Sequence, residues 1–133
     1  MSSSARRKGH QFERDVVNML RDELGSPCNR VLDQYREGEL GDIVLKPFVI
    51  ECKRYACKFE PPSNWWHQAW RAGEHMELTP ILIWKFDRRP IRAMVPLHLL
   101  NSDYPRNETY TAQVDWETLI LIMREEICET EST

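Results

Sequence analysis

Two short apolar stretches on either side of Lys46-Pro47 constrain the fold of this chain more than any other feature. Residues 42–45 and 48–54 are rich in Val, Ile, Leu and Phe, which is typical of buried β-strands, and the proline between them marks a turn. A hairpin with a loop of two or four residues pairs position i with position 93 − i. Asp42 would then lie directly opposite Glu51, and the two side chains would share one face of the sheet.

The charged side chains within these two strands indicate a site. Side chains alternate along a strand, so Glu51 and Lys53 share one face while Ile50 and Cys52 point to the other. Directly opposite residues have Cβ atoms about 4.5 to 5.5 Å apart, and two carboxylates this close repel each other unless a cation lies between them. A divalent metal between Asp42 and Glu51 resolves the repulsion. A set of two carboxylates, a backbone carbonyl and waters favours Mg²⁺, or Mn²⁺, over zinc.

A lysine beside such a metal predicts phosphodiester hydrolysis. The metal neutralises developing charge and lowers the pKa of a bound water, while Lys53 positions the nucleophile or stabilises the transition state. The alternative is a cross-strand salt bridge of Lys53 with Glu51 or Asp42 on an exposed sheet face. The spacing D-x(8)-E-x-K is common by chance, but here it lies within two apolar strands that follow an amphipathic helix, which favours the active-site interpretation.

That helix is predicted over residues 9–24, where apolar residues recur every four positions from Phe12 onward and Gly25 and Pro27 provide a stop signal. Glu13 lies at the edge of the apolar stripe, so we expect it to point at the sheet and to reach the metal through a water. The alternative is an ordinary acidic residue in a first helical turn, which the helix dipole stabilises.

The rest of the chain predicts a mixed sheet flanked by helices, in one domain of ordinary size. We expect strands at 30–35, 80–86, 91–95 and 110–114, a helix from 63 to about 78, a short helix at 96–100 and a last helix capped by Asp115. Residues 1–8 are expected to form a flexible basic arm, and residues 9–133 the folded domain. Trp65, Trp66 and Trp70 are expected to pack in the core or in a dimer interface.

Charge is distributed unevenly along the chain. Residues 1–92 hold 16 Lys and Arg against 13 Asp and Glu, whereas residues 93–133 hold 2 against 8. A basic first part suits binding of a polyanion, although an acidic tail after an ordinary domain has the same signature. The four cysteines have neither zinc-site nor disulfide-framework spacing. With no apolar run near the roughly 20 residues of a membrane span and no secretory signal, we expect a cytoplasmic protein that does not bind membranes.

Three stretches of the sequence resemble the PD-(D/E)xK nuclease superfamily, and in particular the small Holliday-junction resolvases of archaea and phages. The stretches are Arg6-Arg7-Lys8-Gly9 with Phe12-Glu13-Arg14, Gly41-Asp42-Ile43-Val44, and Ile50-Glu51-Cys52-Lys53-Arg54. The resemblance covers about the first half of the chain. It departs from the motif in having no proline before Asp42, which the superfamily tolerates. The resemblance implies an α/β fold with a restriction-endonuclease-like mixed β-sheet flanked by helices.

The resemblance also implies a Mg²⁺-dependent endonuclease that acts as a homodimer on four-way DNA junctions in a prokaryotic cell or phage-infected host. The candidate metal-site residues are Glu13, Asp42, Glu51 and Cys52, the last through its backbone carbonyl. The candidate catalytic residues are Glu13, Asp42, Glu51, Lys53 and Gln68, the last because several related nucleases carry a helix glutamine beside the site. The candidate DNA-binding residues are Arg6, Arg7, Lys8, Arg14, Arg54, Arg88 and Arg89.

Two other functions remain open at this point. The same chemistry serves nicking, restriction-like and mismatch-directed nucleases, whose site would have the same sequence. A non-catalytic DNA-binding relative is disfavoured because the acids and the lysine are all present.

Overall fold

The computed structural model describes residues 3–31, 41–56 and 60–132. Its elements follow one another as α1 (Ser3–Leu24), β1 (Asn29–Arg30), β2 (Ile43–Leu45), β3 (Phe48–Tyr55), α2 (Ser63–Met76), β4 (Thr79–Phe86), β5 (Arg92–Pro96), the 3₁₀ helix η2 (Leu97–Leu99), β6 (Thr111–Asp115) and α3 (Trp116–Ser132). Among these residues, no helix has the length and apolar character needed to cross a membrane.

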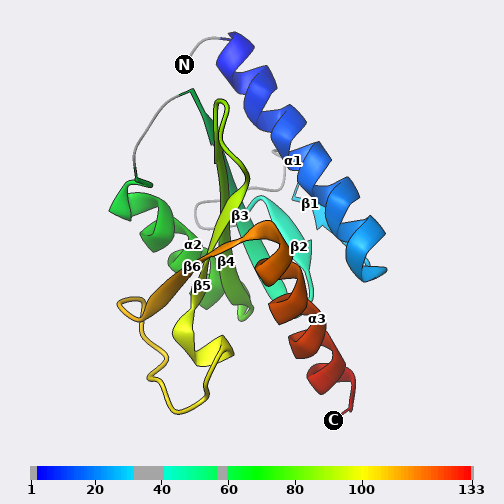
Figure 1. The fold of residues 1–133 in the computed structure, drawn as a ribbon, viewed down its shortest axis with the longest axis vertical. Coiled ribbons are helices and arrows are strands. Elements are labelled where there is room, and N and C mark those ends of the chain that lie inside the picture. Colours follow the sequence, from blue (N-terminus) through cyan, green and yellow to red (C-terminus); the bar gives the residue numbers. More distant parts are fainter. Residues whose placement is uncertain (1–2, 32–40, 57–59, 133) are drawn as a thin grey trace.

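The six strands form one mixed sheet in the order β1-β2-β3-β4-β5-β6 (Figure 1). Strands β3 and β4 are parallel, and every other neighbouring pair is antiparallel. A parallel pair needs a crossover connection, and helix α2 provides it. This arrangement confirms the predicted mixed α/β sheet and places β3 in the interior of the sheet, paired on both sides.

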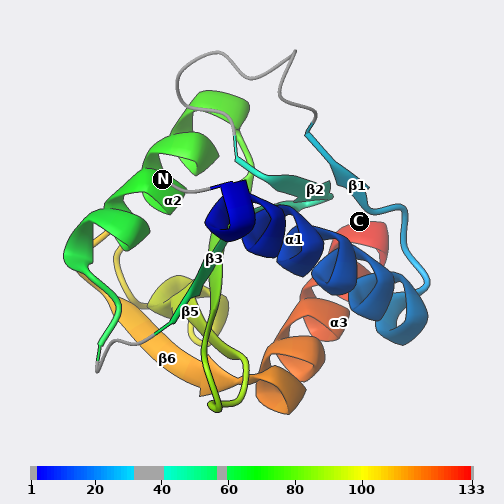
Figure 2. The same cartoon turned by 90° about the horizontal axis from the view of Figure 1, so that it is seen from above.

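Helices cover both faces of the sheet, with α1 and α3 on one face and α2 on the other (Figure 2). The larger core lies under α1 and α3 and includes Leu20, Ile50 and Met123, all fully buried. The smaller core lies under α2 and combines Trp65 and Trp66 with β4 side chains such as Trp84. The alternation of side chains along β3 therefore sends Ile50 and Cys52 towards α1 and leaves the intervening residues facing α2.

The first helix is longer than predicted. Helix α1 begins at Ser3, so residues 3–8, predicted as a basic arm before the helix, are part of it. Ala, Arg and Lys are among the best helix formers, and their exposed side chains allow the helix to extend beyond its packed stripe without a cost in burial. The other helices agree with the prediction, including the cap at Asp115, whose Oδ1 accepts a hydrogen bond from the Thr118 N–H at 2.8 Å.

Within the described residues, the first strand begins and ends one position earlier than predicted. β1 comprises Asn29–Arg30, and the remainder of the predicted segment 30–35 lies outside the described residues from position 32 onward.

Helix α2 ends where Glu77 adopts a left-handed conformation with φ 57°, and the Glu77 N–H donates to the Gly73 carbonyl.

Candidate active site

The register of the β2–β3 hairpin is the one that the sequence predicts. Ile43 pairs with Ile50 and Leu45 with Phe48, so the paired positions sum to 93. The predicted register is therefore confirmed for Ile43–Leu45 and Phe48–Ile50. Asp42 lies just before β2, and its N–H donates to the Ile50 carbonyl at 3.0 Å, so the regular ladder does not extend to the predicted pair of Asp42 with Glu51.

Asp42 is fixed at the end of the hairpin by two features. Its Oδ2 accepts a hydrogen bond from the backbone N–H of Cys52 at 2.8 Å, in buried surroundings. The preceding residue, Gly41, passes so close to β3 that a Cβ there would lie 2.5 Å from Cγ2 of Val49 and 3.7 Å from Cβ of Ala72. A side chain at position 41 would push this segment away from β3, so the glycine allows Asp42 to lie close to β3.

Glu51 and Lys53 project from β3 on the face that α2 covers, and Gln68 of α2 connects them. The Lys53 Nζ donates to Gln68 Oε1 at 2.9 Å, and Gln68 Nε2 donates to Glu51 Oε1 at 3.3 Å. Glu51 is buried, whereas Lys53 is half-buried and Gln68 exposed. The amide therefore holds the lysine between the buried carboxylate and solvent, where a substrate would approach.

Glu13 comes from α1, and α1 covers the opposite face of the sheet from α2, the helix that carries Gln68 (Figure 2). It is 6% exposed, and its Oε1 accepts a hydrogen bond from Arg30 Nε at 3.3 Å. Arg30 of β1 thus partly balances this buried charge, a contact that no sequence pattern predicts.

The thiol of Cys52 is affected by the charges of all three acids. Its pKa is raised well above its usual value, first by burial and then by the negative charges of Asp42, Glu13 and Glu51. The thiol therefore stays protonated at neutral pH, so the atom that Cys52 offers to a metal is its backbone carbonyl oxygen.

The donor atoms test which metal the site fits. Within the described part of the chain, no group of three or more His, Cys, Asp and Glu side chains is arranged to hold a metal ion. The candidate ligands are thus the buried carboxylates of Asp42 and Glu51, and their oxygen donors fit a hard divalent cation. Glu13 remains a predicted contributor that acts through a water.

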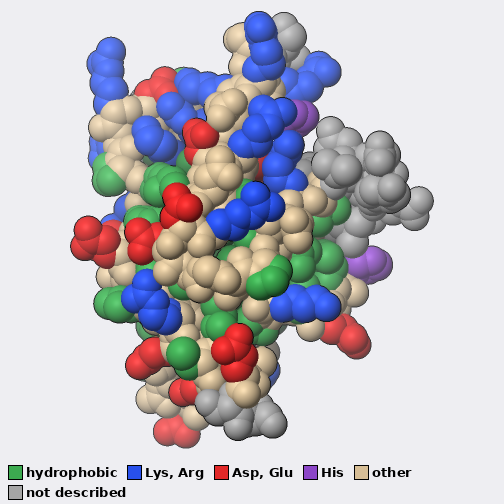
Figure 3. Space-filling view, turned by 90° about the vertical axis from the view of Figure 1, so that its right-hand side faces the viewer, with side chains coloured by type: hydrophobic (Ala, Val, Ile, Leu, Met, Phe, Trp, Pro, Cys, Tyr) green, Lys and Arg blue, Asp and Glu red, His purple; other side chains and the backbone are tan. Residues whose placement is uncertain are grey.

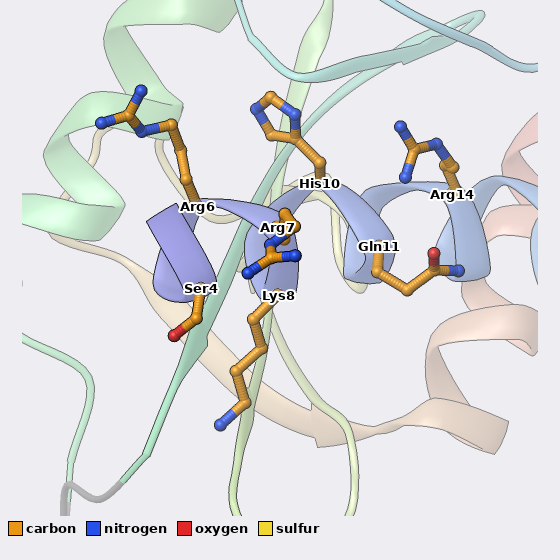
Figure 4. Close-up of a pocket in the computed structure, with 7 residues that line it drawn as sticks. All are labelled: Ser4, Arg6, Arg7, Lys8, His10, Gln11 and Arg14. Atoms are coloured by element: carbon orange, nitrogen blue, oxygen red, sulfur yellow. The ribbon is translucent and has the colours of Figure 1, made fainter. Parts of the chain in front are cut away.

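The predicted DNA-binding residues gather at one end of the molecule. Arg6, Arg7, Lys8 and Arg14 are exposed on the first turns of α1, from which they project in several directions (Figure 4). Arg88 and Arg89 are exposed in the turn after β4. Arg54, near the end of β3, contacts Asp87 of the same turn. Lys and Arg side chains are concentrated at this end of the molecule (Figure 3).

Sequence reasoning missed several contacts around these residues. Asp87 lies between the predicted strands 80–86 and 91–95 and has no predicted role, yet its Oδ1 lies 2.9 Å from Lys8 Nζ and 2.6 Å from Arg54 Nη2. Trp66 is buried, as predicted, but its Nε1–H also donates to the carbonyl of Glu108 at 2.8 Å and so ties the loop before β6 to α2. Both contacts join segments far apart in the sequence, and no local pattern signals them.

Comparison with known proteins gives a family and a fold. A family model described as "Phage putative PDDEXK endonuclease" matches residues 4–128. No curated protein matches the chain. Among solved structures, the Holliday junction resolvase Hjc of the archaeal hyperthermophile Archaeoglobus fulgidus is similar, with a TM-score of 0.50 and 19% identity over 80% of this chain and 86% of that chain. The similarity confirms the predicted restriction-endonuclease-like fold.

Proposed function

Because the chain belongs to the family of phage PDDEXK endonucleases, we propose that it is a metal-dependent endodeoxyribonuclease that resolves four-way DNA junctions by hydrolysing phosphodiester bonds. The observation that carries the proposal is the arrangement of two buried carboxylates, those of Asp42 and Glu51, with Lys53 held by the amide of Gln68. Burial of two acidic side chains lowers the stability of the folded protein, and residues that lower stability are typical of functional sites. Binding of a cation by the two carboxylates would account for their burial.

Asp42 and Glu51, with the backbone carbonyl of Cys52, would hold Mg²⁺, and Mn²⁺ would fit the same oxygen donors. A bound Mg²⁺ supplies a Lewis acid for the phosphodiester and lowers the pKa of a coordinated water. The Cys52 N–H keeps the Asp42 carboxylate oriented through its 2.8 Å hydrogen bond. Glu13, held by Arg30, adds negative charge on the other side of Cys52.

Lys53 acts on the phosphate from the solvent side of the carboxylates. Its ammonium group can donate to a phosphate oxygen and stabilise the charge that develops there during hydrolysis. Gln68 accepts one Lys53 proton in a hydrogen bond and donates to Glu51, so it fixes the distance between the cation and the carboxylate without neutralising either. In this proposal Gln68 is a positioning residue, and Lys53 is the catalytic cation.

Two observations support a four-way junction as the substrate. The exposed basic residues of α1 and of the turn after β4 form a surface suited to DNA backbone. The similar solved structure is that of a Holliday junction resolvase. Resolution needs one nick in each of two strands, and the described residues of one chain provide one Asp42–Glu51–Lys53 set. We therefore propose that the protein acts as a homodimer.

The test is cleavage of an end-labelled four-way junction beside a linear duplex of the same sequence, with Mg²⁺ and with EDTA. Glu51→Ala removes a proposed ligand, and Glu125→Ala, an exposed acid on α3, is the matched control for loss of one negative charge. The proposal expects paired, symmetric nicks in the junction that require Mg²⁺, persist in the control and disappear in Glu51→Ala.

The other outcomes separate the alternatives. Equal cutting of the linear duplex would retain the nuclease and reject the junction. Tight binding of the junction without cutting in either Mg²⁺ or Mn²⁺ would reject catalysis and indicate a DNA-binding relative. Sedimentation of the protein as a monomer, alone and on the junction, would reject the homodimer.

A further inference from the structure

Asp87 is an acidic residue placed within the basic surface. Its Oδ1 accepts a hydrogen bond from Lys8 Nζ at 2.9 Å and forms an ion pair with Arg54 Nη2 at 2.6 Å. Lys8 lies on α1 and Arg54 on β3, so one carboxylate joins two elements that are distant in the sequence. Arg88 and Arg89 follow it directly and are exposed.

The contact lies where DNA can reach it. The side chains of Lys8 and Asp87 are 41% and 40% exposed, while that of Arg54 is 15% exposed. Lysine and arginine around one anionic oxygen form the arrangement that such side chains make with a backbone phosphate. A carboxylate and a phosphodiester each carry one negative charge and accept hydrogen bonds through oxygen.

The carboxylate is ionised throughout the neutral pH range. Hydrogen bonds from Lys8 and then Arg54 hold the pKa of Asp87 below its usual value. Its charge is therefore present whenever the protein meets DNA, and both cations are partly neutralised in the free protein.

We propose that Asp87 occupies, in the free protein, the position that a DNA phosphate takes between Lys8 and Arg54. Binding of DNA then exchanges one anion for another, and the displaced carboxylate is left close to the negatively charged backbone. Asp87 thereby weakens DNA binding and limits its salt dependence. This inference rests on the proposed function, but it concerns affinity and makes no claim about the chemical step.

Competition with phosphate and positioning of the two cations predict opposite changes in DNA affinity when Asp87 is neutralised. If Asp87 only positioned the two cations, neutralising it would weaken binding. If it competes with phosphate, Asp87→Asn should tighten binding by about two- to fivefold, the range expected for exposed ion pairs. Because the displaced carboxylate of the natural protein takes up a cation, the plot of log K against log salt should also become steeper by about one unit in the variant.

The experiment measures fluorescence anisotropy of a labelled four-way junction in EDTA, so that no strand is cut, over a series of salt concentrations. Asp87→Asn is compared with Asp22→Asn, which makes the same charge change at an exposed position further along α1. Both substitutions are repeated in a Lys8→Gln/Arg54→Gln background, where the proposed phosphate partners are absent. Circular dichroism checks that each variant is folded.

In the natural background, we expect Asp87→Asn to increase the affinity for the junction more than Asp22→Asn does. In the Lys8→Gln/Arg54→Gln background, we expect the two substitutions to have equal effects. Equal effects of the two substitutions, or weaker binding by Asp87→Asn, would overturn the competitor role while leaving the proposed nuclease intact. If the natural protein and all variants fail to bind the junction, the proposed function itself fails, and this inference with it.

Discussion

Asp42 makes one contact that allows its structural role to be separated from its chemical one. Its Oδ2 accepts a hydrogen bond from the Cys52 N–H, and the side chain is 6% exposed. In Asp42→Asn the carboxamide oxygen can accept the same hydrogen bond, and the loss of a negative charge beside Glu51 and Glu13 removes repulsion. In Asp42→Ala the Cys52 N–H loses this acceptor inside the protein.

The two substitutions should therefore differ in stability and agree in activity. A buried donor that loses its acceptor costs about 1 to 3 kcal/mol. For a chain of this length, a loss of about 2 kcal/mol lowers Tm by roughly 6 to 10 °C. We expect Asp42→Asn to unfold at or slightly above the temperature of the natural protein, and Asp42→Ala to unfold well below it. Both variants should lose cleavage, because both lose a proposed metal ligand.

The assay is thermal unfolding by circular dichroism in EDTA, paired with junction cleavage in Mg²⁺. Excluding metal isolates the hydrogen bond from any stabilisation by a bound ion. If Asp42→Ala and Asp42→Asn unfold at the same temperature, the hydrogen bond to Cys52 contributes nothing measurable. Full cleavage by Asp42→Asn would refute the proposed ligand role, whatever the stabilities.

Three further predictions follow from contacts at other positions. Gln68→Ala removes the amide bridge between the lysine and the glutamate, and should lower kcat about tenfold with little change in KM, measured by single-turnover and steady-state cleavage; an unchanged kcat would exclude a positioning role. Gly73→Ala should lower the free energy of unfolding in urea by about 1 to 2 kcal/mol, because the added Cβ would lie 2.8 Å from the Leu78 carbonyl oxygen. Gly9→Ala is the control, since its Cβ would meet open space, and it should raise the free energy of unfolding by up to about 1 kcal/mol. Burial raises the pKa of the Cys28 thiol from 9.0 to about 11, so its stabilising contribution is complete below pH 9 and is lost as the pH rises towards 11; the free energy of unfolding should fall less across that interval in Cys28→Ala than in the natural protein.

The sequence predicted those parts of the site that depend on local geometry. The register of the hairpin follows from turn length and strand alternation, so the pairing of Ile43–Leu45 with Phe48–Ile50 could be worked out from residue spacing alone. The bond of the Asp42 N–H to the Ile50 carbonyl, which departs from that register, could not. The same alternation places Glu51 and Lys53 on one face, and the structure agrees. Gln68 was suggested by resemblance alone, whereas its position between the two charged residues follows from the hydrogen bonds that it makes to both.

The parts that could not be predicted depend on contacts between distant segments. The pairing of Glu13 with Arg30 depends on where β1 passes α1, which no periodicity defines. Lys8 and Asp87 are 79 positions apart, so no local pattern in the sequence predicts their ion pair. The start of α1 was also missed, because a hydrophobic period shows where a helix packs and says little about exposed turns beyond its packed stripe.

The central place of β3 in the sheet has a consequence for how the protein loses activity. β3 is paired with β4 over its whole length and with β2 over Phe48–Ile50, so the amides that bond within these ladders can exchange with solvent only when a ladder opens. The first turns of α1, which carry the basic residues, are exposed and lie at the free end of a helix. Fraying on warming should begin in those turns, while the strand that bears Glu51 and Lys53 opens with the whole domain. On warming, DNA binding would then be lost before the catalytic geometry. Hydrogen exchange measured residue by residue would show exchange in the first turns of α1 before exchange in β3.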